Sequence, residues 1–221
     1  MRPRSTRSEP RGERVAVRRH DGPRLIGARV LLRPLRAQDF DAWSEVRQAN
    51  RTWLEPWEPR PEPGAPDPVA DGDAFRGRCS AWDRQRQFDS AYGFGLFLCD
   101  HEQFVGEVSL GSVQRGPFQS ASIGYWIDER HAGRGYVPEG VALMLRYGFE
   151  ELHLHRMEAA IVPRNAPSRR VAEKLGLRVE GTSLGFLQID GVYEDHVRYA
   201  MTTEEWAARR SEIESLTARR G

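Results

Sequence analysis

A strand-like apolar run that passes through a glycine-containing turn into a helix constrains this chain more than any other feature. The run is 123–127, and an apolar-periodic segment over 137–152 predicts the helix. Between them, Gly133 and Gly135 allow positive φ and leave no Cβ in the way of a ligand. Because backbone N–H groups at a helix start lack partners, the turn predicts an anion site, most often for phosphate. A glycine-rich turn without a ligand is the alternative interpretation.

Two arginines, Arg130 and Arg134, add positive charge that can reach phosphate oxygens. Other phosphate-binding signatures fit this chain less well. It has no Gly-Lys-Ser/Thr ending of a nucleotide-triphosphate loop and no Gly-x-Gly-x-x-Gly dinucleotide fingerprint.

The chain has 33 basic and 32 acidic residues, so its net charge is close to zero. Its overall charge therefore does not favour binding to nucleic acid or to a membrane surface. The exception is the N-terminus, where residues 1–36 contain eleven Arg against three acidic residues. We expect residues 1–27 to form a basic, flexible arm. A solvated tail and a contact with RNA or a ribosome both remain open for it.

The two cysteines, Cys79 and Cys99, have no metal-ligand spacing and predict free thiols in a reducing cytoplasm. No apolar run approaches the roughly 20 residues of a membrane span, and the N-terminus lacks a secretory signal. We therefore expect a soluble cytoplasmic protein without a metal, either a monomer or a homodimer.

Hydrophobic periodicity predicts an α+β domain over 28–202, followed by a C-terminal helix and tail at 203–221. Six prolines in the thirteen residues 56–68 predict an extended loop from Trp53 onward. We expect one mostly antiparallel sheet flanked by helices, with a parallel crossover around the helix at 137–152. The predicted strands are 29–35, 92–98, 103–110, 121–127, 156–162, 178–189 and 192–201, and the predicted helices are 37–50, 74–87, 137–152 and 165–175.

The spacing Arg-x-x-Gly-x-Gly at 130–135 resembles the pyrophosphate loop of the GNAT superfamily of N-acetyltransferases. Asn165-Ala166-Pro167-Ser168, with Glu173 to Leu177 after it, resembles a second motif of that superfamily, and the predicted element order is similar. The segments 190–196 and 53–57 are similar to the Rim-type ribosomal-protein-alanine N-acetyltransferases.

This resemblance implies a GNAT-like (acyl-CoA N-acyltransferase) fold and an acetyl-CoA-dependent N-acetyltransferase. The acceptor would be a primary amine, above all the N-terminal α-amine of a ribosomal protein, acetylated directly in a ternary complex. Two alternatives remain open: acetylation of a small amine or a lysine, and a non-catalytic acyl-CoA-binding module. Ribosome contact through the basic arm is a further expectation.

For the cofactor, the resemblance implies that pantetheine lies along Ile123–Asp128, where a backbone N–H of Trp126 or Ile127 polarises the thioester carbonyl. Asn165 would reach the pantetheine amides, although helix capping explains Asn165 and Ser168 equally well. The expected pyrophosphate residues are Arg130, His131, Ala132, Gly133, Arg134, Gly135 and Tyr136.

The general base is harder to assign. Many relatives carry a Glu where this chain has Ser122 and a Tyr where it has Ala172. Glu107 is the nearest carboxylate on a central strand, though a solvent-facing Glu is the commoner case. Ser168 is a candidate proton donor to the leaving thiolate, and Ser122 stays a candidate because of its position. Catalysis by positioning, with water carrying the proton, is the alternative.

The acceptor cleft is expected between the Pro-rich loop and the last hairpin. Trp53 and Trp57 offer aromatic walls, and Glu55 would attract an ammonium group. Tyr193 and Asp195 approach from the hairpin. Alternatively, the two tryptophans attach the loop to the body of the domain, and both roles can hold together.

Overall fold

Eight strands form one sheet in the computed structural model, which describes residues 22–217. Their order is β1-β2-β3-β4-β5-β6-β8-β7, and β5–β6 is the parallel pair among otherwise antiparallel neighbours. The predicted α+β fold and its crossover are therefore confirmed. The strands are β1 (Leu25–Ile26), β2 (Val30–Arg33), β3 (Tyr92–Leu98), β4 (Gln103–Gln114), β5 (Ser120–Ile127), β6 (Arg156–Ile161), β7 (Arg178–Ile189) and β8 (Val192–Thr202).

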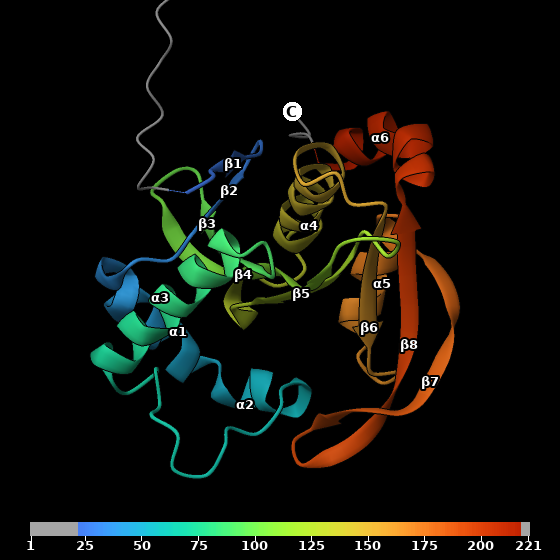
Figure 1. Ribbon diagram of the computed structural model, residues 1–221. Helices are drawn as coiled ribbons and strands as arrows, with labels where there is room; N and C mark the ends of the chain where they lie inside the picture. The colour runs from blue at the N-terminus through green and yellow to red at the C-terminus, as the bar shows by residue number, and fades with distance from the viewer. Residues whose placement is uncertain (1–21, 218–221) are drawn as a thin grey trace, which may run out of the picture.

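Helices cover both faces of this sheet (Figure 1). The α-helices are α1 (Phe40–Ala49), α2 (Arg51–Leu54), α3 (Gly72–Gln87), α4 (Tyr136–Arg146), α5 (Ala166–Lys174) and α6 (Thr203–Thr217). Short turns of other helical types are η1 (Ala37–Asp39), η2 (Glu55–Trp57), η3 (Glu129–His131) and the π-type η4 (Tyr147–Glu151).

Alternation along the strands divides the core between the two faces. Leu31 packs in a cluster with Trp43 and Phe75 of α1 and α3, whereas Leu32 belongs to the larger cluster that includes α4, α5 and α6. Helix α4 lies close to the sheet because Gly140 has no side chain: a Cβ there would stand 3.1 Å from Leu96. The buried face of α4 thus fixes where its N-terminus, and the loop before it, can lie.

The sheet opens between β5 and β6. The two strands pair over 120–122 and 156–158 only, and no residue pair joins them beyond Ser122 and Glu158. Figure 1 shows β5 and β6 diverging from that point. The second half of β5 therefore has a strand neighbour on one side alone, which leaves backbone groups available along the opening.

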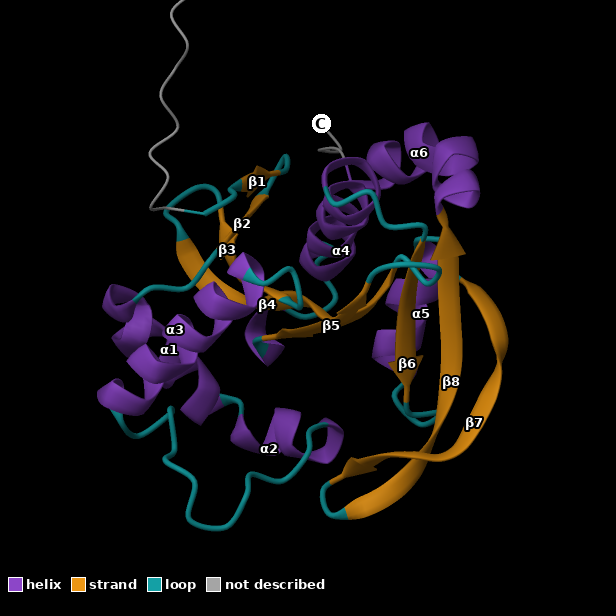
Figure 2. Cartoon of the chain, viewed as in Figure 1, coloured by secondary structure: helices purple, strands orange, loops and turns teal. Residues whose placement is uncertain are grey.

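The proline-rich segment corrects one prediction. Its first residues are helical, because α2 continues into the 3-10 turn η2 at Glu55–Trp57, with Pro56 in its first turn (Figure 2). Proline is compatible with a helix start, where its missing N–H costs nothing. An extended loop remains after Trp57.

The N-terminal part of the chain also differs from expectation in detail, whereas the C-terminal helix α6 begins at Thr203 as predicted. Residues 1–21 of the predicted arm lie outside the described residues, and its last part forms β1, which pairs with β2. Within the described residues, neither Cys79, which is buried, nor Cys99 forms a disulfide. In the stretch 22–217, no helix is long and apolar enough to cross a membrane.

Candidate active site

The turn at 128–135 has backbone geometry that suits an anion. Gly133 and Gly135 have φ of +72° and +83°, a region that favours glycine, and α4 starts at Tyr136. The first backbone bond of that helix is donated by Glu139 N–H to the Gly135 carbonyl, at 3.3 Å. The N–H groups ahead of Glu139 have no partner inside the helix. They and the positive end of the helix dipole suit a phosphate.

The two loop arginines are in different situations. Arg130 donates from Nε and Nη2 to the carboxylate of Asp128, at 2.9 and 2.7 Å for Oδ2. The Arg134 side chain makes no ion pair with any residue between 22 and 217. Arg134 is thus the cation of the loop that is available to a ligand, whereas Arg130 neutralises a buried carboxylate.

Asp128 organises the start of the loop. Its side chain is buried and accepts from the backbone N–H of Arg130 and from the Asn50 side chain, at 3.1 and 3.0 Å. Burial raises the pKa of Asp128, but the hydrogen bonds from Arg130 and Asn50 outweigh it, and the net pKa is lowered. Asn50 also accepts from Glu129 N–H at 2.8 Å.

His131 lies inside the same loop and packs against Tyr136, with ring centroids 6.2 Å apart. Burial lowers the pKa of its imidazole, which is therefore neutral at pH 7. Its Nδ1 is buried and has no hydrogen-bond partner within the described chain. A buried polar atom without a partner costs stability unless a ligand completes it, so this atom also favours an occupied loop.

The register of β5 on β4 decides which amides face the opening. Asp128 N–H donates to the Val105 carbonyl at 2.8 Å, and Trp126 is paired with Glu107. Since hydrogen-bonding residues alternate in an antiparallel ladder, Trp126 turns its N–H toward β4. Tyr125 and Ile127 turn theirs away from β4, toward the opening. Of the two amides considered for the thioester carbonyl, the one at Ile127 is therefore accessible.

The far side of the opening is lined by the start of α5. The Asn165 side chain accepts from Ser168 N–H at 3.2 Å and caps this helix, so the capping alternative holds for Asn165. Its amide nitrogen keeps its donors for another partner. The Tyr125 hydroxyl donates to the Ser168 carbonyl at 2.9 Å and joins β5 to α5. Burial raises the pKa of Tyr125 to about 12, so it stays protonated.

Glu107 is not a solvent-facing residue. Its side chain is 8% exposed and accepts from Trp43 Nε1 and from Arg78 Nη2, both at 2.5 Å. Both partners come from the helices α1 and α3 that cover this face. These contacts favour a structural ion pair, and the assignment of Glu107 as a base stays a prediction.

Ser122 lies at the last pair before the opening, opposite Glu158 on β6. Its side chain is exposed, whereas Ala172 on α5 is buried. Glu158 accepts from Arg156 at 2.6 Å and from Arg198. Burial acts to raise the pKa of Glu158, but these two arginines lower it overall. Glu158 is therefore a weak proton acceptor.

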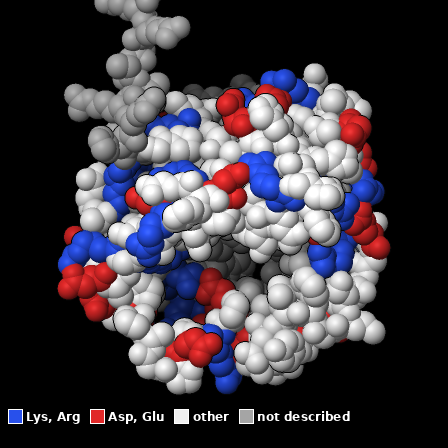
Figure 3. Space-filling view, in the orientation of Figure 1, with Lys and Arg blue, Asp and Glu red and all other residues white. Residues whose placement is uncertain are grey.

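A hollow lies between the region of α1 and α2 and the β7–β8 hairpin, where the acceptor cleft is expected (Figure 3). Trp53 Nε1 donates to the Ile127 carbonyl at 3.1 Å, so this tryptophan attaches the α2 segment to β5. The Arg164 guanidinium lies 4.9 Å from the ring centre of Trp57 and donates to Glu194 at 2.5 Å. The cleft thus runs up to the opening beside β5.

The two walls of this hollow meet at its rim. Asp190 N–H, in the hairpin turn, donates to the Glu58 carbonyl at 3.0 Å. Arg60 Nε donates to the Asp190 carboxylate at 2.7 Å. The hollow is consequently bounded by the loop after η2 on one side and by the hairpin tip on the other, with a link between them.

Three acceptor candidates take no part in this link. Glu55 is largely exposed and pairs with Arg51 at 3.2 Å, one turn along the helix. Asp195 accepts from Gly185 N–H at 2.8 Å and stabilises the hairpin itself. Tyr193 is 68% exposed on the hairpin and is free to meet an acceptor.

Sequence patterns missed three residues that organise the site: Asn50, Arg29 and Glu139. Asn50 holds Asp128, while Arg29 and Glu139 bond to each other and Arg29 bonds to the loop. Their partners lie 78 to 110 positions away in the sequence, so no local motif carries the signal.

Comparison with known proteins agrees with this geometry. The profile of a family described as acetyltransferase (GNAT) domain matches residues 29–178. The chain is 36% identical over 172 residues to "Probable N-acetyltransferase YjcK" of Bacillus subtilis, covering 78% of this chain and 93% of that protein. It is 32% identical over 189 residues to "[Ribosomal protein uS5]-alanine N-acetyltransferase" of Escherichia coli, covering 85% and 94%. The solved structure of Mycobacterium smegmatis RimJ in complex with CoA-disulfide has a TM-score of 0.73 at 32% identity, covering 86% of this chain and 94% of RimJ.

Proposed function

This chain belongs to the GNAT family of acetyltransferases and is an N-acetyltransferase, and from that premise we propose that it moves acetyl from acetyl-coenzyme A to the N-terminal amine of a protein. The proposal combines an anion loop, an opened strand edge and a bounded acceptor cleft. The relatives with ribosomal-protein-alanine names make a ribosomal protein the first acceptor class to test.

The observation that carries the proposal is the enclosed rim of the cleft. Because Glu58, Arg60 and Asp190 link the two walls, a chain end enters this hollow more readily than a lysine in the middle of a folded surface. Trp53 and Trp57 would form part of the wall. The Arg164 guanidinium already lies over the Trp57 ring, so the Trp53 ring is the one that would favour an arriving ammonium group.

When bound, acetyl-coenzyme A supplies the thioester and thus the acyl group that is transferred. The backbone N–H groups at Gly133 to Tyr136, together with Arg134, would hold its diphosphate. The N–H groups of Tyr125 and Ile127 would pair with the pantetheine, as an added strand does. Asn165, through its free amide donors, would fix the same arm from the side of α5.

Proton transfer needs a separate assignment. The carboxylates considered near the opening, Glu107 and Glu158, are both held by arginines, and for Glu158 the arginines lower the pKa. We therefore favour catalysis by positioning, in which water removes the amine proton and Ser168 hydroxyl assists the leaving thiolate. Ser122 is exposed beside the opening, where it can hold such a water.

Release of free thiol from acetyl-coenzyme A tests the proposal. The acceptors are a peptide that begins with Ala, the same peptide blocked at its N-terminus but containing an internal Lys, and a polyamine. We expect turnover with the free N-terminus and little with the other two. Preference for the blocked peptide or the polyamine would reject the N-terminal acceptor. Binding of coenzyme A without turnover on any amine would indicate a non-catalytic module.

A further inference from the structure

A half-buried ion pair between Arg29 of the N-terminal segment and Glu139 of α4 contacts the anion loop. Arg29 precedes β2, and Glu139 lies in the first turn of α4. Arg29 Nε donates to Glu139 Oε2 at 2.9 Å, and Arg29 N–H donates to Glu139 Oε1 at 2.7 Å. The Glu139 side chain is 1% exposed, so its charge requires these partners.

The remaining nitrogens of the Arg29 guanidinium reach the loop itself. Nη1 donates to the Arg134 carbonyl at 3.1 Å, and Nη2 donates to the Gly135 carbonyl at 3.3 Å. The planar guanidinium therefore binds Glu139 through Nε, and it binds two consecutive carbonyls of the anion loop through Nη1 and Nη2. We call Arg29 and Glu139 the clamp.

The direction of these carbonyls determines the direction of the amides. In a trans peptide the C=O and the N–H of one unit point in opposite directions, and the described chain has no cis peptide bond. With the Arg134 and Gly135 carbonyls turned toward Arg29, the N–H groups of Gly135 and Tyr136 point away from it. That is the side on which a diphosphate would lie at the helix start.

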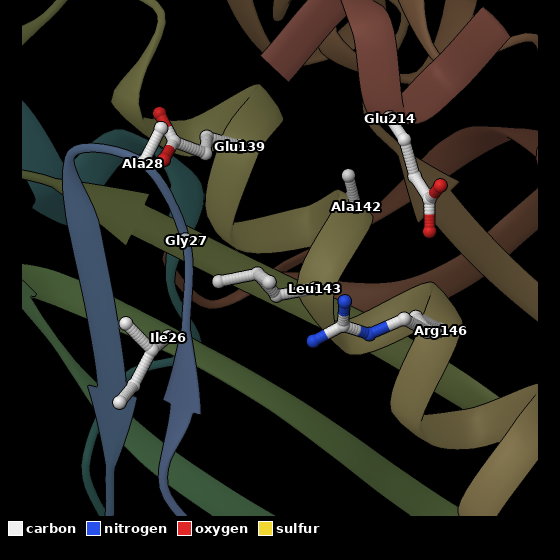
Figure 4. A pocket seen from close by; sticks show the side chains of 8 residues that line it. All are labelled: Ile26, Gly27, Ala28, Glu139, Ala142, Leu143, Arg146 and Glu214. Atoms are coloured by element: carbon white, nitrogen blue, oxygen red, sulfur yellow. The ribbon is translucent and has the colours of Figure 1, made fainter. Parts of the chain in front are cut away.

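Gly135 is required by the clamp as well as by its φ. A Cβ at this position would stand 3.2 Å from Arg29 Nη2. Figure 4 shows Glu139 reaching from α4 to the segment with Gly27 and Ala28, which joins β1 to β2. A Cβ at Gly27 would be 2.6 Å from Glu139 Oε1, so both sides of the clamp are closely packed.

We infer that Arg29, fixed by Glu139, is a positioning residue that orients the Gly135 and Tyr136 amides toward the diphosphate of the acyl donor. This inference rests on the proposed function, because it takes coenzyme A as the loop's ligand. Arg29 acts through the backbone and contacts no reacting atom. Orienting donors before the ligand arrives reduces the ordering cost of binding.

The test compares two ligands, of which one lacks the diphosphate. Coenzyme A binding is measured by calorimetry, and turnover is measured with S-acetylpantetheine as a truncated acyl donor. For Arg29→Ala and for Arg29→Lys we expect a Kd for coenzyme A about tenfold weaker, because neither side chain can bond Glu139 and both carbonyls. The KM for S-acetylpantetheine should not change. Glu139→Gln, which keeps the shape of the side chain, should weaken coenzyme A binding in the same direction.

Arg24→Ala is the matched control, because Arg24 lies in the same segment and pairs with Glu102 at 2.8 Å, away from the loop. It should bind coenzyme A as the wild type does. Wild-type affinity in Arg29→Lys would show that charge alone matters and would overturn the inference. An equal rise in the KM for S-acetylpantetheine would also overturn it, as a general structural defect. If the wild-type protein bound no coenzyme A, the proposed function would fail first, and the inference with it.

Discussion

The indole N–H of Trp53 donates a 3.1 Å hydrogen bond to the carbonyl oxygen of Ile127, at the end of the strand edge that faces the opening. This hydrogen bond occupies the Ile127 carbonyl oxygen. The Ile127 N–H takes no part in it and stays available to a ligand. The segment that walls the acceptor cleft is thereby fixed to the strand on which we place the pantetheine. One residue thus relates the two substrate positions to each other.

Glycine 135 should be needed for cofactor binding beyond its effect on stability. Gly135→Ala and Gly116→Ala both place Cβ at positive φ, +83° and +65°, at a cost of roughly 1–2 kcal/mol each. A Cβ at Gly116 meets nothing within 4 Å, whereas one at Gly135 presses on Arg29. Calorimetry should show coenzyme A bound about tenfold more weakly by Gly135→Ala alone. Equal affinities of the two variants for coenzyme A would show that the loop is not part of the cofactor site.

Asn165 offers a separation of capping from ligand binding. Asn165→Asp keeps an oxygen for the Ser168 N–H but loses the amide donors, and Asn165→Ala loses both. We expect Asn165→Ala alone to lower the free energy of unfolding, by about 1 kcal/mol. Both should raise the KM for acetyl-coenzyme A about tenfold, since each loses a hydrogen-bond donor to the ligand. An unchanged KM in Asn165→Asp would leave Asn165 as a cap and nothing more.

Glu107 can be tested as a base against its role as a buried ion pair. Glu107→Gln leaves Arg78 without its counter-ion, and we expect a loss of about 1–3 kcal/mol in the free energy of unfolding. The pH–rate profile of the folded variant should keep the wild-type shape. Glu151→Gln, at an exposed carboxylate, is the control, with a change of less than about 0.5 kcal/mol. Loss of the wild-type decline at low pH, with a rate deficit that grows toward high pH, would instead support Glu107 as the base.

The ion pairs of Glu180 on β7 with Arg156 on β6 and with Arg178 predict an acid-sensitive stability. Hydrogen bonds from Arg156, with help from Arg178, lower the pKa of Glu180 from 4.5 to about 2. A depressed pKa in the folded state stabilises the protein above pH 4.5, and this contribution is lost as the pH falls from 4.5 toward 2. Denaturant unfolding of Glu180→Gln should therefore show lower stability at pH 7 and a shallower decline below pH 4.5. If the stability of the variant fell below pH 4.5 as steeply as that of the wild type, groups other than Glu180 would cause the acid sensitivity.

The sequence predicted the fold well because its signals are local. The apolar run at 123–127, the Asp190-Gly191 turn and the glycines of the loop each act within a few residues, and their elements appear as expected. The helical start of the proline-rich segment was missed, because the six prolines outweighed the helix-compatible position of Pro56.

The side-chain chemistry of the site was harder to predict, because it depends on contacts between distant segments. Whether Glu107 faces solvent or Arg78 depends on how α3 packs on β4, which no local pattern states. The choice between the Trp126 and Ile127 amides required the register of β5 on β4. Arg29 looked like the first residue of a strand, and its role emerges only from its bonds to Glu139 and the loop.

Residue-resolved amide hydrogen exchange along β5, with and without coenzyme A, tests the central claim most directly. In the free protein, the Gly124 and Trp126 amides should exchange slowly, because they pair with β4, and the Tyr125 and Ile127 amides should exchange quickly. Coenzyme A should slow exchange at Tyr125 and Ile127, and at Gly135 and Tyr136 in the loop. If coenzyme A bound without protecting Tyr125 and Ile127, or protected Gly124 and Trp126 instead, the strand-edge account of the cofactor site would be contradicted.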